Sequence, residues 1–410
     1  MRGNLESRID DIVRKSISAG AMPGCQVLVA KGGQVVIDKA YGTLNRGGSA
    51  KVNNETLFDV ASMSKVCGTL SALMKSYDQG KWKLNDPIAK YLPELKEKPL
   101  GKVTMEELLY HQSGLPASLN IFEVVLDTAT YSGPAVKYRY GAPYTIKIQE
   151  DVYGNKDARL RSDIFSSEKS EKFHLPVAKG IYASDEARAV IMDSIYNIEP
   201  KAKKYLYSDL NFCLLMQIQE NITGVPHDRW VTEQIFLPLG AQTTGYNPSM
   251  RGLTDNVAPT EVDNYLRRQH VKGYVHDETA AFSGGVQGNA GLFTTAHELA
   301  PLFQTWLNGG VYGGKRIYSE ETVELFTGSK SKISDRGLGF DRLVSKKAWG
   351  VSPETYGHTG FTGTCFWIDP TRNLIYIFLS NRVNPTRDNK AFTKSNPRNN
   401  ILKAVYDSMN

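Results

Sequence analysis

Apolar residues change their spacing several times along the chain. Over residues 4 to 19 they recur every three or four positions, the period of an amphipathic helix. Two short segments rich in β-branched residues follow, at 26–30 and 34–40. The turn sequence Lys31-Gly32-Gly33 lies between them. This pattern predicts an N-terminal helix followed by a β-hairpin.

Residues 57 to 77, LFDVASMSKVCGTLSALMKSY, again carry apolar residues at helical spacing, which predicts a buried helix. Ser62 and Lys65 open it, and residues three apart share one face of a helix. The positive end of the helix dipole disfavours a charged lysine there. We therefore expect a neutral Lys65 that accepts the proton of Ser62 and makes this serine a nucleophile.

The pattern Ser-x-x-Lys is weak by itself, since about two matches arise by chance in a chain of this length. Two further matches, Ser166/Lys169 and Ser329/Lys332, lie in polar runs that are typical of solvated loops. Only Ser62/Lys65 opens an apolar helix. The alternative for this pair is a helix-capping serine beside a surface lysine.

The remaining pattern separates a helical middle from a β-rich end. Residues 81–285 are mainly helical, except for a polar, tyrosine-rich stretch at about 118–200. Strands are predicted at 337–343, 356–358, 365–369 and 374–380, and a closing helix at 397–409. No crossover helices separate these strands, so the sheet should be mostly antiparallel.

These elements predict an α/β (α+β) fold, with a mostly antiparallel sheet flanked by helices. Residues 1–80 and 286–410 would form one α/β domain, and 81–285 a mainly helical domain inserted between them. Long irregular segments are usually functional or carry small structures of their own. We expect the insertion at about 118–200 to narrow or cap the cleft and to influence substrate choice.

Composition excludes several classes of function. Of 410 residues, 41% are hydrophobic and 22% charged, as in ordinary globular enzymes. The net charge of +6 is spread along the chain without a basic stripe, which argues against a nucleic-acid partner. No apolar run has transmembrane length. The four cysteines lie far apart without a C-x-x-C pair, so we expect buried free thiols and no zinc site, although disulfides stay open.

The charged N-terminal helix differs from a signal peptide. We expect a periplasmic or cell-envelope location if the chain is a mature or excised portion of a longer precursor. A cytoplasmic location stays open, as does the oligomeric state.

Two further motifs carry candidate chemistry. Tyr207-Ser208-Asp209 precedes an apolar helix, and a tyrosine beside a lysine ammonium can act as a base. His358-Thr359-Gly360 lies on or next to a predicted strand, where glycine allows another backbone or a ligand to approach closely. Taken singly, the tyrosine is more often a packed aromatic and the histidine a satisfied core or surface residue.

The order of the three motifs, Ser-x-x-Lys, Tyr-Ser-Asp and His-Thr-Gly, resembles the serine β-lactamase and penicillin-binding protein superfamily, in its class C, DD-peptidase and esterase-like branch. Flanking segments are similar as well: LNDPIAKYLPEL, VTMEELLYHQSGLP, IFLPLGA, GNAGLFTTAHELA and GHTGFTGTCFWIDP. The similarity covers nearly the whole chain apart from about 118–200.

The resemblance implies a site between the two domains and assigns roles by motif position. Ser62 matches the acylated serine, Lys65 its partner and Tyr207 the tyrosine that shares the role of base. His358, Thr359 and Gly360 match the third motif, which contacts substrate. The backbone N–H groups of Ser62 and Phe361 match the oxyanion hole, whose donors act where charge develops. No cofactor or metal is implied, and the partner is a small-molecule or peptide substrate.

Three departures argue against an efficient β-lactamase. Asp209 replaces the usual asparagine, so a carboxylate stands where an amide donates to substrate. His358 replaces the usual lysine and weakens a fixed positive charge. The stretch before Tyr207 is also longer than in a typical class C enzyme.

Two hypotheses follow. In the first, the protein is a serine hydrolase that forms an acyl-enzyme on an ester, a D-amino-acid peptide or a cell-wall-derived substrate, with weak or no true β-lactamase activity. In the alternative, it is a catalytically inactive, penicillin-binding-like domain that recognises wall peptides. The presence of Ser62, Lys65 and Tyr207 together favours the enzyme.

Overall fold

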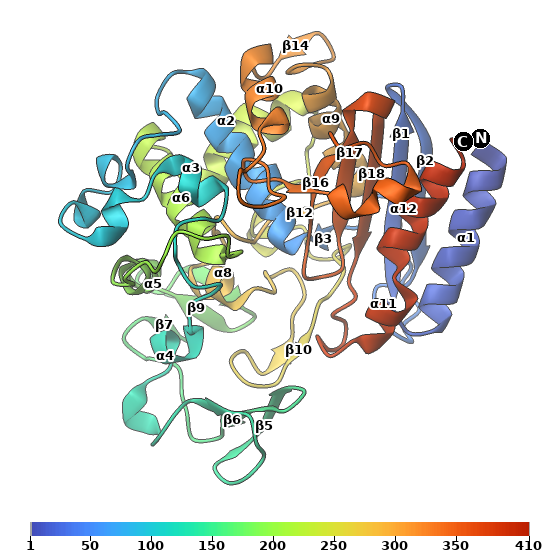
Figure 1. The fold of residues 1–410 in the computed structure, drawn as a ribbon. Helices are drawn as coiled ribbons and strands as arrows, with labels where there is room; N and C mark the ends of the chain where they lie inside the picture. The colour runs from blue at the N-terminus through green and yellow to red at the C-terminus, as the bar shows by residue number, and fades with distance from the viewer. Residues whose placement is uncertain (1, 410) are drawn as a thin grey trace.

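A six-stranded antiparallel sheet joins the two ends of the chain (Figure 1). The computed structural model describes residues 2–409, and the strand order is β15-β16-β17-β18-β1-β2. The strands are β1 (Gly24–Lys31), β2 (Gln34–Gly42), β15 (Asp341–Arg342), β16 (Tyr356–Thr359), β17 (Cys365–Asp369) and β18 (Leu374–Ser380). Strand β1 pairs with β18 from Cys25↔Ser380 to Lys31↔Leu374. The expected antiparallel α/β fold is confirmed.

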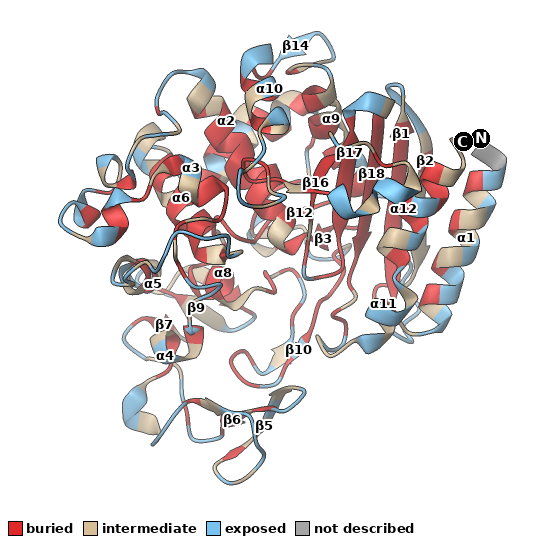
Figure 2. Ribbon diagram, viewed as in Figure 1, coloured by how far each residue is buried: buried red, intermediate tan, exposed pale blue. Residues whose placement is uncertain are grey.

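Side chains of the central strands alternate between two hydrophobic layers. Val27 and Val29 pack on α1 (Arg2–Ser18) and α12 (Pro397–Asp407), whereas Leu28 and Ala30 face a larger core on the other side. This is the period of two that a strand imposes on its side chains. Figure 2 shows the buried strands between helices whose outer faces are exposed.

Helices cover both faces of the sheet. Helices α1 and α12 lie side by side, joined by an ion pair of 2.8 Å between Arg8 Nη2 and Asp407 Oδ2, and α11 (Lys390–Ser395) lies next to them. Helix α9 (Ala296–Leu307) packs on β1 and β18 from the other side. Beyond it lie the remaining helices: α2 (Ser71–Asp78), α3 (Met105–Leu109), α4 (Ile121–Val125), α5 (Asp185–Tyr196), α6 (Asp209–Thr223), α7 (His227–Val231), α8 (Glu278–Phe282) and α10 (Glu320–Gly328).

The predicted helix over 57–77 is built from three kinds of turn. After the short strand β3 (Phe58–Asp59), a 3-10 turn η1 (Ala61–Met63) leads into a π-helix η2 (Lys65–Leu70) and then into α2. Strand β3 pairs with β12 (Phe293–Thr294). π-Helical turns inside helices often mark functional sites, because their wider spacing changes the direction in which side chains point.

The stretch 118–200 is more regular than its sequence predicts. It holds α4, α5 and two three-stranded sheets, made of β4 (Val136–Lys137), β5 (Tyr144–Gln149) and β6 (Val152–Asn155), and of β7 (Phe165–Ser166), β8 (Leu175–Ala178) and β9 (Ile181–Ala183). Other short pairs are β10 (Val262–Asp263) with β11 (Gln269–His270), and β13 (Val311–Tyr312) with β14 (Lys315–Arg316). The domain boundaries near 80 and 285 stay a prediction.

The four cysteines are buried free thiols, as expected: Cys25, Cys67, Cys213 and Cys365. Within residues 2–409, no helix combines the length and the apolar character that crossing a bilayer requires.

Candidate active site

A buried carboxylate holds the backbone that carries Ser62. Asp59 accepts the N–H of Ala61 at 2.8 Å with Oδ1 and the N–H of His276 at 2.7 Å with Oδ2. Ala61 has φ +48°, a left-handed conformation that costs a non-glycine residue free energy. The Asp59 side chain thus fixes a strained turn directly before Ser62, whose own side chain is only partly buried.

The Lys65 side chain is fully buried, and three oxygen atoms lie within hydrogen-bond distance of its Nζ. Its Nζ lies 2.9 Å from Ser62 Oγ, 3.0 Å from the carbonyl oxygen of Asn289 and 2.6 Å from Asp209 Oδ1. Its side chain is 0% exposed, whereas Lys169 and Lys332 of the other two Ser-x-x-Lys matches are exposed. Only the pair Ser62/Lys65 therefore has the geometry of a nucleophile beside a proton-handling group.

The expectation that Lys65 is neutral is wrong. Burial lowers the pKa of Lys65, but the carboxylate of Asp209 and the neighbouring Tyr207 outweigh burial and raise this pKa above its ordinary value. The helix dipole alone does not set this pKa, because the carboxylate of Asp209 at the start of α6 contacts Lys65 directly.

Tyr207 lies directly before α6 and is surrounded by cations and imidazoles. Lys65 Nζ is 5.2 Å and the Arg336 guanidinium carbon 5.1 Å from the centre of its ring. The ring of His111 lies at 4.6 Å and that of His358 at 6.0 Å. The structure therefore brings the first and second motifs together, with positive charge next to the tyrosine.

His358 lies on β16 and is 2% exposed. Its Nδ1–H donates to the carbonyl oxygen of Thr359 at 2.7 Å, so in the neutral ring Nε2 is an acceptor. Burial, together with the charges of Arg336 and Lys65, lowers the pKa of His358 well below 6.5. This position thus offers a neutral acceptor where a lysine would offer a charged donor.

The turn after β16 approaches the nucleophile closely. A Cβ atom at Gly360 would collide with the backbone oxygen of Val60, so a side chain there would displace one of the two segments. Thr362 Oγ1 donates to the carbonyl oxygen of Asp59 at 2.7 Å, and Thr364 Oγ1 to that of Val60 at 3.1 Å. The expected close approach at Gly360 is therefore made by the segment that leads to Ser62.

These groups line an open cavity of about 430 Å³. Its walls carry Ser62, Tyr207, His358, Thr359, Gly360 and Phe361, together with three arginines and two residues of α11: Arg336, Arg382, Arg398, Phe392 and Thr393. Asp209 is not among them; its carboxylate contacts Lys65, and its side chain is 28% exposed.

The three arginines make the wall of the cavity positively charged, and no carboxylate is among the residues that line it. Arg382 donates to the carbonyl oxygen of Phe361 at 2.7 Å, and Arg398 to that of Thr364 at 3.2 Å. Burial, together with the nearby charge of Arg398, lowers the pKa of Arg382. Guanidinium groups that bond only to backbone oxygens keep N–H donors for a carboxylate or phosphate.

Sequence reasoning missed several residues of the site, among them Asn289, His111 and Arg336 and the wall residues Arg382, Arg398, Phe392 and Thr393. Asn289 acts through its backbone oxygen, and the glycine-rich run GVQGNAGLF was its only signal. His111 begins the HQSGLP segment with φ +56°, and its Nδ1 accepts the N–H of Ser208 at 3.1 Å. Arg336 lies in a polar run that has no periodicity. His111 Nε2, His358 Nε2 and Arg336 Nη1 are buried without hydrogen-bond partners in the described chain, whereas most buried polar atoms in proteins have a partner.

The insertion at 118–200 contributes no residue to the wall of this cavity, and its expected role in narrowing or capping the cleft and in substrate choice stays a prediction. Glu150, in the turn after β5, pairs with Lys390 at the start of α11 at 2.6 Å. The insertion thus contacts α11, whose Phe392 and Thr393 form part of the cavity wall, and its helix α5 packs on α6, which starts at Asp209.

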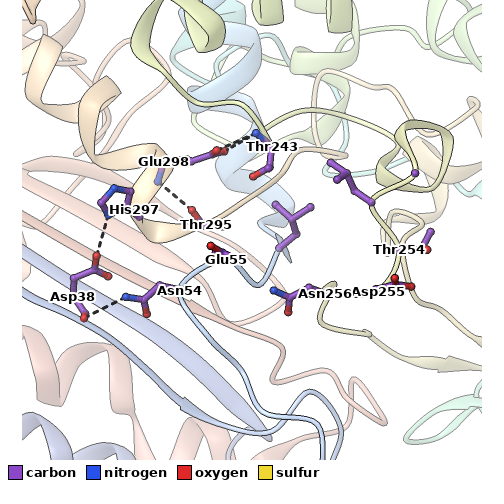
Figure 3. A pocket seen from close by; sticks show the side chains of 13 residues that line it. Asp38, Asn54, Glu55, Thr243, Thr254, Asp255, Asn256, Thr295, His297 and Glu298 are labelled. Atoms are coloured by element: carbon purple, nitrogen blue, oxygen red, sulfur yellow. Dashed lines mark hydrogen bonds and ion pairs between the residues drawn. The ribbon is translucent and has the colours of Figure 1, made fainter.

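A larger hollow of about 780 Å³ lies elsewhere, between α9 and residues 252–256 (Figure 3). Glu298 accepts the N–H groups of residues 242 to 244, and Asp38 pairs with His297 at 2.9 Å. The carboxylates of Glu298 and Asp38 are thus already bonded to other groups of the protein. This hollow also holds no nucleophile beside a base. Across residues 2–409, no group of three or more His, Cys, Asp or Glu side chains is placed to hold a metal.

Comparisons with known proteins agree with this geometry. The family model described as Beta-lactamase matches residues 9–394. A protein of Escherichia coli (strain K12) named "Putative D-alanyl-D-alanine carboxypeptidase" is 32% identical over 407 residues, covering 92% of this chain and 82% of its own length. The chain therefore belongs to the β-lactamase family, which confirms the resemblance drawn from the three motifs.

Solved structures show the same fold at lower identity. EstCE1, described as a hydrolase with promiscuous acyltransferase activity, has a TM-score of 0.67 at 20% identity and covers 98% of both chains. A penicillin-binding protein homologue from Caulobacter crescentus has a TM-score of 0.66 at 17% identity, covering 99% of this chain and 98% of its own. The fold is thus that of β-lactamase-related hydrolases.

Proposed function

We propose that this protein is a serine hydrolase that forms an acyl-enzyme through Ser62. The observation that carries the proposal is the distance of 2.9 Å between Ser62 Oγ and Lys65 Nζ on the wall of an open cavity shared with Tyr207 and His358. A positioned nucleophile beside proton-handling groups is the arrangement that covalent catalysis requires. Family membership supports the same conclusion.

The roles follow from position. Ser62 attacks the substrate carbonyl, and Lys65 and Tyr207 manage its proton. The backbone N–H groups of Ser62 and Phe361 are the proposed oxyanion donors. The Phe361 N–H makes no hydrogen bond within residues 2–409, so it is free to donate. His358, Thr359 and Gly360 contact substrate from the edge of β16, where all three face the cavity.

For the substrate, we propose a peptide that ends in a D-amino acid with a free carboxylate. The three arginines of the wall match such an anion, because guanidinium groups bind carboxylates with paired N–H donors. The name of the Escherichia coli relative supports this class of substrate. Esters and other wall-derived fragments share the acyl chemistry and belong in the same panel, and a cell-envelope location would suit these substrates.

The test is covalent labelling followed by intact mass spectrometry. Fluorescent penicillin or a fluorophosphonate should add one label to the wild type and none to Ser62→Ala. Ser166→Ala is a matched control, because this serine also starts a Ser-x-x-Lys pattern but lies on β7 next to an exposed lysine. Labelling of folded Ser62→Ala would contradict the proposal.

A substrate panel separates the enzyme from the inactive alternative. Release of D-alanine from a D-Ala-D-Ala peptide, or hydrolysis of an ester, should depend on Ser62. Binding of wall peptides without labelling or turnover would favour the catalytically inactive, penicillin-binding-like domain.

A further inference from the structure

The Phe361 N–H belongs to a tight turn between β16 and β17. The N–H of Gly360 donates to the carbonyl oxygen of Thr364 at 2.8 Å, and the N–H of Gly363 donates to that of Gly360 at 3.0 Å. Phe361 and Thr362 have negative φ and Gly363 has φ +102°, the pattern of a type I turn followed by a glycine in the left-handed region. The proposed oxyanion donor is thus the first of the two central residues of this turn.

Arg382 binds the peptide group in the middle of the turn. Its Nε–H donates to the carbonyl oxygen of Phe361 at 2.7 Å, and its backbone N–H donates to that of Thr362 at 2.9 Å. Type I and type II turns differ by a rotation of this middle peptide, so the bond to Phe361 holds the turn in one form. Arg382 comes two residues after β18, a fully buried central strand, and therefore acts from a rigid element.

The Phe361 side chain cannot hold the turn by burial, because it is 50% exposed on the cavity wall. The centre of its ring lies 4.6 Å from the guanidinium carbon of Arg382, a distance at which a cation is attracted to the face of an aromatic ring. The ring of His276 stacks on Phe361 at 5.7 Å, with an angle of 21° between the ring planes. Arg382 therefore contacts both the backbone and the ring of Phe361.

The later residues of the turn are tied to the segment that carries the nucleophile. Thr362 Oγ1 and Thr364 Oγ1 donate to the carbonyl oxygens of the two residues before Ala61, as described for the site. Within residues 2–409 the carbonyl oxygen of Phe361 has only Arg382 as a donor. The separation of the two proposed oxyanion donors thus depends on the threonine bonds at one end of the turn and on Arg382 at the other.

We propose that Arg382 is a positioning residue that holds the Phe361 N–H toward the substrate carbonyl oxygen, and that it does not anchor the substrate carboxylate. This inference rests on the proposed acylation of Ser62 and its oxyanion hole. Two nitrogens of Arg382, Nε and Nη1, bind the backbone oxygens of Phe361 and Arg387. Arg398 binds the backbone through Nη1 alone, so the two arginines have separate roles.

The test compares an uncharged ester with its thionoester, in which sulfur replaces the carbonyl oxygen. Sulfur is larger than oxygen and a weaker hydrogen-bond acceptor, so a well-placed oxyanion hole favours the oxygen ester. The ratio of kcat/KM for the two esters therefore reports how well the N–H donors are placed. A general loss of folded protein lowers both values equally and leaves this ratio unchanged.

Arg382→Gln should lower kcat for the ester by about ten- to a hundredfold, because a small displacement at the reacting centre can cost that much. KM should stay nearly unchanged, as expected when an interaction made only in the transition state is weakened, and the preference for the ester should fall. Arg382→Lys keeps a donor for the Phe361 carbonyl and should recover part of kcat. Arg316→Gln on β14 is the matched control, because Arg316 also donates to two backbone oxygens, those of Gly309 and Tyr318, and its loss should leave the kinetics unchanged.

Three results would overturn the inference. One is an unchanged kcat in folded Arg382→Gln. Another is a rise in KM that is confined to peptides with a free carboxylate, which would place Arg382 in the anion site. The third is an equal loss on the ester and the thionoester, which would show that Arg382 only supports the fold.

If Arg382→Gln does not fold, Arg382→Met replaces it in the same comparison, since methionine keeps an unbranched side chain without a donor. Failure of the proposed function is distinguishable from failure of this inference. In that case wild-type Ser62 would take no fluorophosphonate label and the wild type would hydrolyse neither ester, so both proposals would fall together.

Discussion

The carboxylate of Asp59 accepts the backbone N–H of Ala61 at 2.8 Å and so holds the left-handed residue next to Ser62. Its second oxygen accepts the N–H of His276 at 2.7 Å. One buried side chain therefore links the nucleophile turn to the segment before α8. Within residues 2–409 neither N–H has a second acceptor, so the loss of Asp59 leaves both without a partner.

Asp59→Ala should lower the free energy of unfolding by at least about 2 kcal/mol, because an unsatisfied buried donor costs about 1–3 kcal/mol. It should also slow the labelling of Ser62, since the turn loses its anchor. Urea unfolding and labelling rates check this. The exposed Asp255→Ala should change stability by no more than about 0.5 kcal/mol. A similarly small effect of Asp59→Ala would contradict the anchoring role.

Arg398→Gln should raise KM for peptides that end in a free carboxylate by about ten- to a hundredfold, because a hydrogen bond to a charged group is worth about 1.5–3 kcal/mol. Activity on esters that lack a carboxylate should change little. Steady-state kinetics on a peptide and its C-terminal amide provide the comparison. An equal loss of activity on both substrates would show that Arg398 supports the fold of the cavity and does not bind the substrate carboxylate.

β-Lactam turnover should be weak. The buried His358 is neutral and an acceptor, so it gives a β-lactam carboxylate no steady positive partner at the edge of β16. Nitrocefin hydrolysis should stay below the range of good enzymes, roughly tens per second. His358→Lys should increase it, with His358→Gln as a neutral control. Fast hydrolysis by the wild type would refute this expectation.

Asp277→Asn should change the pH dependence of stability. Burial and the charge of Asp209 raise the pKa of Asp277 from 3.8 to about 6. The folded state thus holds this proton more tightly than the unfolded state, and ionising Asp277 costs stability as pH rises from about 4 to about 6. The asparagine lacks this cost, and one oxygen can still accept from Ala280 and Asn289.

The stability gained by Asp277→Asn relative to the wild type should therefore grow across this window, by up to about 3 kcal/mol above pH 6. Urea unfolding at pH 4, 5, 6 and 7.5 measures the difference. The exposed Asp255→Asn is the control for removing a carboxylate. A difference that is constant or shrinks with rising pH would contradict the assignment of the proton to Asp277.

Much of the sheet was predictable because its strands are buried and bounded by turn residues. The predicted strands 365–369 and 374–380 coincide with β17 and β18, and the turn Asp369-Pro370-Thr371-Arg372 separates them. The two small sheets within 118–200 could not be predicted, since their strands are only two to six residues long and carry no clear alternation.

The motifs predicted that one site contains Ser62, Lys65, Tyr207 and His358. They did not predict the charge states of these residues. The ion pair between Lys65 and Asp209 joins residues 144 positions apart. No local pattern encodes such a contact. The role of Arg336 in the site could not be predicted either, because its polar run resembles any solvated loop. Only the fold brings Arg336 next to Tyr207.

The pairing of β1 with β18 has a consequence for the order of synthesis. The segment that carries Ser62 leaves the ribosome long before His358. Strand β1 can pair with β2 at once, but it finds its second neighbour, β18, only when residues 374–380 have been made. Until then β1 exposes an unpaired edge of apolar residues, the kind of surface that promotes aggregation. A nascent or prematurely terminated chain thus carries the nucleophile without a cavity, and hydrolytic competence should arise only when the last strand closes the sheet.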